Sequence, residues 1–244
     1  LNTGPGAPVP STRGLLSTVC WRLGARAETA YALEGSVAIA GAGVQWLRDN
    51  MQIITSASEI EAKARSVRDA GNVVFVPAFS GLFAPRWRAD ARGVIVGLTQ
   101  HSTAAHVCRA LLDAISFQTV DVLDAMRADA DDAARAAGEG SSPRPLRRLR
   151  VDGGASANGL LMQIQADALG LPVSRPANVE TTAAGAALAA GVGAGLWREE
   201  DIFADGADAD ASSSTLFQPA TDAATREARY AKWADAIERS LGLA

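Results

Sequence analysis

The sequence is poor in residues that bind metals or build disulfide frameworks. It holds two cysteines, Cys20 and Cys108, and two histidines, His101 and His106, with no metal-ligand spacing among them. We therefore expect free cysteines, as in a reducing compartment such as the cytoplasm, and no metal site within the chain. With no paired nucleophile nearby, neither histidine is assigned a catalytic role.

Long apolar runs and excess positive charge are also missing. No segment reaches the roughly 18 apolar residues that a membrane-spanning helix needs. The net charge is −4, so no basic field is available to hold a nucleic acid backbone. We expect neither a membrane span nor a nucleic acid partner.

Several familiar signals are absent as well. The chain begins at Leu1 without an initiator methionine or a leader segment, and we expect it to be a piece of a longer polypeptide. The Walker A and G-x-G-x-x-G phosphate loops do not occur. No Ser-His-Asp set or carboxylate pair follows from the spacing, so no catalytic residue is predicted.

What is present predicts an α/β fold, because β-rich apolar runs alternate with helical patterns. The predicted strands are 73–79, 93–98 and 149–151, with a short extended piece at 172–175. The predicted helices are 35–49 with Ser36 as N-cap, one that starts after Ser102 or Thr103, 158–169, 181–191 and 222–241. Segments 128–145 and 204–214 are rich in Ala, Asp, Gly and Ser, which predicts flexible loops.

The sharpest local motif is residues 150–158 (RVDGGASAN), where a strand ends in two glycines and a helix follows. Paired glycines let a ligand approach the backbone, and the helix start offers unpaired N–H groups. An adenine or a phosphate fits this description, and so does an ordinary tight turn. Asp152 is interpreted either as the cap of that turn or as a contact to a cation or water.

Two further helical segments are rich in small residues. In residues 41–45 (GAGVQ), Gln45 lies one turn after Gly41, so it can face a ligand or simply accompany tight helix packing. Residues 181–191 (TTAAGAALAAG) form a thin helix, which we expect to pack against a sheet or another helix.

The chain resembles the C-terminal domain of the FGGY carbohydrate kinases, with members that act on glycerol the closest in pattern. The matching stretches occur in family order along almost the whole chain. They are 2–4 (NTG), 31–35 (YALEG), 40–49 (AGAGVQWLRD), 76–82 (VPAFSGL), 91–93 (ARG), 97–99 (GLT), 151–154 (VDGG), 180–182 (ETT), 185–187 (GAA), 229–230 (RY) and Trp233.

This resemblance implies an actin/hexokinase-like ATPase with ribonuclease-H-like domains, each a mixed sheet with flanking helices. It implies transfer of the γ-phosphoryl group of ATP, with magnesium, to glycerol or a similar polyol. The nucleotide contacts of the family fall on Gly41 and Gln45 at the phosphates, and on Gly154 and Asn158 at the adenosine. The whole of 1–244 is then the C-terminal nucleotide-binding domain, and the N-terminal domain is absent.

The family's catalytic base and acceptor site belong to that missing domain, so we expect the isolated chain to be inactive. A homo-oligomer is also implied by resemblance. The chain departs from the family pattern at Arg86 and Arg88, which flank Trp87. Two alternatives stay open: another FGGY sugar kinase of the pentulose type, and a non-catalytic nucleotide-binding module.

Overall fold

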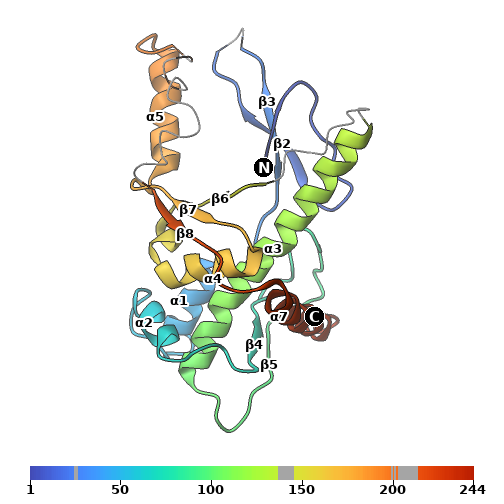
Figure 1. The fold of residues 1–244 in the computed structure, drawn as a ribbon, viewed down its shortest axis with the longest axis vertical. Helices are drawn as coiled ribbons and strands as arrows, with labels where there is room; N and C mark the ends of the chain where they lie inside the picture. Colours follow the sequence, from blue (N-terminus) through green and yellow to red (C-terminus); the bar gives the residue numbers. More distant parts are fainter. Residues whose placement is uncertain (25–26, 137–145, 199, 201, 203–213) are drawn as a thin grey trace.

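The structure is a computed structural model that describes residues 1–24, 27–136, 146–198, 200, 202 and 214–244. Figure 1 shows helices and short sheets arranged around one long helix, α3. The strands are β1 (Asn2–Pro5), β2 (Leu16–Trp21), β3 (Ala30–Glu34), β4 (Val74–Val76), β5 (Val94–Val96), β6 (Leu149–Arg150), β7 (Val173–Arg175) and β8 (Thr215–Phe217). The helices are α1 (Gly41–Asp49), α2 (Glu59–Arg65), α3 (Ala104–Ala136), the 3-10 turn η1 (Gly154–Ala157), α4 (Gly159–Leu169), α5 (Thr181–Gly193) and α7 (Ala223–Arg239).

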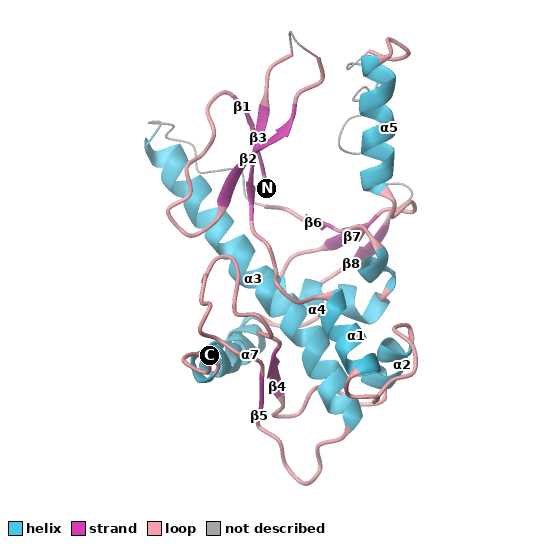
Figure 2. Cartoon of the chain, turned by 180° about the vertical axis from the view of Figure 1, so that it is seen from behind, coloured by secondary structure: helices cyan, strands magenta, loops and turns pink. Residues whose placement is uncertain are grey.

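The core is built around α3, whose 33 residues cross the molecule diagonally in Figures 1 and 2. Its apolar residues recur at helical spacing, so one side meets α2 and α4 while another meets β4 and α7. Leu111 and Leu112 are almost fully buried in the cluster shared with α4. Burial of this kind is the main stabilising contribution in such a domain.

The strands form three small sheets. The sheet β6-β7-β8 is mixed, because β6 runs parallel to β7 while β8 runs antiparallel to it. The sheet β1-β3-β2 and the pair β4-β5 are antiparallel. The strands β4, β5, β6 and β7 confirm the four predicted strands, each in a shorter form, while β1, β2, β3 and β8 were not predicted.

A buried carboxylate ties α7 to α3 and explains one departure from the family pattern. Asp121 on α3 accepts bonds from Arg86, at 3.1 Å, from the indole Nε1 of Trp233, at 3.1 Å, and from the hydroxyl of Tyr230. Burial and this carboxylate raise the pKa of Tyr230. The second arginine, Arg88, forms an ion pair with Asp90, which lowers the pKa of Asp90 to about 2. Both arginines therefore have carboxylate partners within the chain.

Two elements stand apart from this core. Figure 1 shows α5 and the β2–β3 hairpin projecting from one end of the molecule. In α5 only Gly191 is buried, although the helix is made almost entirely of Ala, Gly, Leu and Val. The expectation that residues 181–191 pack against a sheet or a helix is therefore wrong for the described chain.

Two boundary predictions are also wrong. The first helix begins at Gly41 rather than near Ser36, and its N-cap position is Ala40 without a side-chain hydrogen bond. Residues 36–40 lie outside the helix because Val37 turns into the core with Leu15 and Leu33. Segment 128–145 is not a loop throughout, since α3 continues to Ala136. The buried Asp129 holds that part of the helix by accepting the backbone N–H of Thr12 at 3.1 Å.

The remaining predictions have mixed outcomes. Residues 137–145 and most of 204–214 lie outside the described residues. Thr103 directly precedes α3, and its hydroxyl lies 2.9 Å from Nδ1 of His106. Cys20 is exposed and free, while burial raises the pKa of the free Cys108 thiol to about 11. Within the described ranges, no helix is both long and apolar enough to cross a bilayer.

Candidate functional site

The first part of the site is the start of α1. Gly41 is the first helical residue, and no side chain caps the helix there. Uncapped first-turn N–H groups and the helix dipole favour an anion at this end. Gln45 is exposed one turn later, on the same side of the helix as Gly41.

The second part is the turn after β6. Gly153 has a φ of 75°, a conformation that side chains disfavour, and its N–H donates to the carbonyl of Val179 at 3.0 Å. Ser156 closes the turn by donating its hydroxyl to the carbonyl of Gly153 at 2.7 Å. The turn is thus fixed by its own backbone and leads directly into η1 and α4.

The third part is the start of α4, which is already capped. The side chain of Asn158 accepts the N–H of Leu161 at 2.9 Å, and Glu61 accepts the N–H of Leu160 at 3.0 Å. These bonds satisfy two of the N–H groups that a helix start leaves unpaired. A phosphate is therefore disfavoured at the start of α4. Of the two ligand groups that the sequence leaves open at this motif, the neutral ring of a base is favoured over a phosphate.

These parts line one open cavity of about 400 Å³, within the usual range for small-molecule sites. The cavity is lined by all four residues that the sequence singled out: Gly41, Gln45, Gly154 and Asn158. Its apolar walls include Leu112, Ile115 and Leu161. A Cβ added at Gly41 or at Gly154 would meet nothing within 4 Å, so both glycines leave room for a ligand to reach the backbone.

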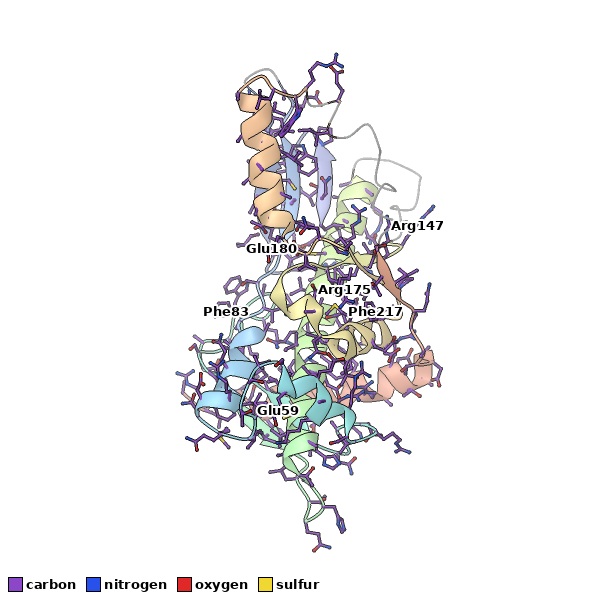
Figure 3. The ribbon with its side chains drawn as sticks, turned by 90° about the vertical axis from the view of Figure 1, so that its left-hand side faces the viewer. Glu59, Phe83, Arg147, Arg175, Glu180 and Phe217 are labelled. Carbon is purple, nitrogen blue, oxygen red and sulfur yellow. The ribbon has the colours of Figure 1, made fainter. Side chains whose placement is uncertain are left out.

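The turn is supported from behind. Arg175 donates to the carbonyl of Ser156 at 2.8 Å, and its guanidinium lies over the ring of Phe217 at 5.3 Å. Figure 3 labels these two side chains beside each other, with Glu180 near the start of α5. Asp152 accepts a bond from the hydroxyl of Thr181 and does not cap the turn after it. The interpretation of Asp152 as the cap of that turn is therefore wrong.

One lining segment was missed by the sequence analysis; it contributes Ala57, Ser58, Ile60 and Glu61. They come from α2 and the segment before it. Nothing in the sequence marks Glu61, because its pairing with Arg65 four residues on is typical of an exposed helix face. Among the described residues, no three His, Cys, Asp or Glu side chains come together as a metal site.

Comparison with known proteins agrees with this architecture. The family model for the C-terminal domain of the FGGY carbohydrate kinases matches residues 5–194. The glycerol kinase of Arabidopsis thaliana is 52% identical over 244 residues, which is 100% of this chain and 45% of the relative. The glycerol kinase of Nocardia farcinica is 52% identical over 241 residues, covering 98% of this chain and 46% of the relative.

Solved structures show the same likeness. The crystal structure of Plasmodium falciparum glycerol kinase with ADP superposes with a TM-score of 0.81 at 35% identity, over 99% of this chain and 44% of that one. A gluconate kinase from Lactobacillus acidophilus, at 19% identity and a TM-score of 0.69, shares the fold. The chain spans a little under half the length of these relatives.

The class of protein follows from these findings: the chain has the α/β, actin/hexokinase-like ATPase fold. More particularly, it belongs to the FGGY family of carbohydrate kinases, and the region of the family that it matches is the C-terminal domain.

Proposed function

We propose that this chain is the nucleotide-binding half of an ATP-dependent glycerol kinase, an enzyme that forms glycerol 3-phosphate. The observation that carries the proposal is the meeting of Gly41, Gln45, Gly154 and Asn158 around one cavity, although more than a hundred residues separate the two pairs. Identities near 50% to glycerol kinases favour glycerol over other acceptors. Sugar kinases at 18–24% identity support the fold alone.

The cavity has two chemically different ends, which orient the nucleotide. The uncapped start of α1 suits the phosphates, with Gly41 giving backbone access and the Gln45 amide donating to an oxygen. The capped start of α4 suits the adenosine, with Gly154 open to the base and Asn158 beside it. ATP bound in this direction supplies the phosphoryl group that is transferred.

Other groups must come from outside this chain. The relatives are roughly twice as long, and we infer that a second domain supplies the acceptor site, the base and the ligands of magnesium. Phosphoryl transfer depends mainly on positioning and charge neutralisation, so closure of the two halves would complete the enzyme. By itself the chain should bind nucleotide without phosphorylating glycerol.

Free cysteines fit a location in the cytoplasm.

The proposal is tested by replacing Asn158 in the intact enzyme. Asn158→Ala should raise the KM for ATP about tenfold, the effect of a lost hydrogen bond near 1.4 kcal/mol, and leave the KM for glycerol nearly unchanged. Asn158→Ser keeps an oxygen that caps α4 and should still raise the KM for ATP, which separates binding from helix stability.

Asn178→Ala is the matched control. Asn178 also accepts a backbone N–H, from Glu180 at 2.9 Å, but it does not line the cavity. This variant should keep both KM values. An unchanged KM for ATP in both Asn158 variants would contradict the adenosine assignment.

A further inference from the structure

The cavity leaves open which group recognises the edge of the base. Its lining side chains with hydrogen-bonding atoms are Gln45, Ser58, Glu61 and Asn158. The Oδ1 of Asn158 already accepts the N–H of Leu161, so Asn158 approaches the base mainly with its NH₂ donors. An amino group on the base is better served by an acceptor from another residue.

Glu61 is the strongest acceptor at this end of the cavity. It extends from α2, and its Oε1 accepts three bonds: from the N–H of Leu160 at 3.0 Å, and from Nε and Nη2 of Arg65 at 3.0 and 2.8 Å. Oε2 receives none of these bonds. The carboxylate is thus held beside the start of α4, with one oxygen available for a ligand.

The two other candidates are less suitable. Gln45 belongs to α1, at the end that suits phosphates. Ser58 already shares a bond with the hydroxyl of Ser56, at 3.0 Å. Arg65 does not line the cavity, and its side chain is half exposed, so it offers the base no donor.

We propose that Glu61 selects adenine over guanine by accepting a hydrogen bond from the 6-amino group of adenine. Guanine places a carbonyl oxygen at that position, and two facing acceptors would leave both desolvated and unpaired. The assignment rests on the proposed function, since it requires a purine nucleotide in this cavity. It gives Glu61 a role beyond capping α4.

The experiment measures binding of ADP and GDP to the intact protein by calorimetry. Wild-type protein should bind ADP at least tenfold more tightly than GDP, the discrimination expected for one mismatched polar contact. In Glu61→Gln the amide oxygen can still accept the N–H of Leu160, while the NH₂ can donate to the guanine carbonyl. The ADP preference should then fall to about threefold or less.

Glu59→Gln is the matched control, because Glu59 lies on the same helix and accepts from Thr55 at 2.6 Å without lining the cavity. Figure 3 labels Glu59, the first residue of α2. This variant should keep the wild-type ADP preference. A purely structural role for Glu61 would weaken ADP and GDP in parallel and leave their ratio unchanged.

A second ligand isolates the amino group. The diphosphate of purine riboside lacks the 6-amino group, and wild type should bind it about tenfold more weakly than ADP. Glu61→Gln should show less than about a threefold difference.

The outcomes separate the two proposals. Selective ADP binding that Glu61→Gln does not alter overturns the role of Glu61 and leaves the kinase assignment standing. Equal affinities of the wild-type protein for ADP and GDP also overturn the role of Glu61 and leave the kinase assignment standing. If the intact protein binds neither nucleotide, the proposed function fails and the role of Glu61 fails with it.

Discussion

The helices α4 and α5 are similar in sequence character and opposite in environment. Each follows a strand of the same mixed sheet, and each is short and mostly apolar. In α4, six of its residues are buried: Leu160, Leu161, Met162, Ile164, Gln165 and Ala166. In α5, only Gly191 is buried. Apolar composition therefore predicts that a helix needs a covering surface, and it does not say where that surface comes from.

The helix starts differ in the same way. The start of α4 is capped by Asn158 from its own turn and by Glu61 from α2. The start of α5 follows Glu180, which forms no side-chain cap. α4 is thus tied to the core at its first turn, whereas the start of α5 is joined to the rest of the described chain by the bond from the Thr181 hydroxyl to Asp152.

The largest expected effect comes from making one substitution in both helices. Leu160→Ala in the isolated chain should reduce the free energy of unfolding by about 3 kcal/mol, because Leu160 is only 6% exposed and its removal leaves a cavity. Leu188→Ala should change it by less than about 0.5 kcal/mol, because Leu188 is 38% exposed. Urea unfolding measures both.

The same pair in the intact enzyme sharpens the comparison. If another part of the protein covers α5, Leu188→Ala should there reduce the free energy of unfolding by about 2 kcal/mol. Equal losses for the two leucines in the isolated chain would break the contrast between the helices.

A smaller effect is expected from the helix starts. Asn158→Ala should destabilise the isolated chain by about 1 kcal/mol, the usual effect of losing an N-cap. Glu180→Ala removes no cap and should change the free energy of unfolding by less than about 0.3 kcal/mol. Thermal unfolding followed by circular dichroism compares them, and a larger loss for Glu180→Ala would show an interaction of α5 that the fold does not contain.

Some features of the fold and of the site can be predicted from local signals in the sequence. The sequence predicts helices that start at Asn158 and at Asp222, and both residues cap them, because a cap bonds to N–H groups two or three residues on. The turn at Gly153–Gly154 can also be predicted locally, because the conformational freedom of glycine is a property of the residue itself. Helical spacing also predicts that Gly41 and Gln45 share one side of a helix, and both lie on α1 and line the cavity.

Non-local partners could not be predicted. Glu61 reaches the N–H of Leu160, 99 residues away, and no pattern within α2 announces that bond. Ser36 resembled an N-cap, yet its segment follows β3 into the core and the helix starts five residues later. The continuation of α3 past residue 128 depends on Asp129 and the segment around Thr12, a contact that spans 117 residues.

The last prediction concerns two glycines of α5, Gly185 and Gly191. A Cβ added at Gly185 meets nothing within 4 Å, while one at Gly191 would overlap the ring of Trp197, whose nearest atom is at 2.0 Å. Alanine favours a helix over glycine by up to about 1 kcal/mol, so Gly185→Ala should raise the helicity of the isolated chain. Gly191→Ala should raise the helicity less, because the half-exposed Trp197 must move.

In a Trp197→Ala background the two glycine variants should show the same helicity by circular dichroism. If they remain different, the indole is not what holds this end of α5, and the helix has an anchor other than its one buried residue.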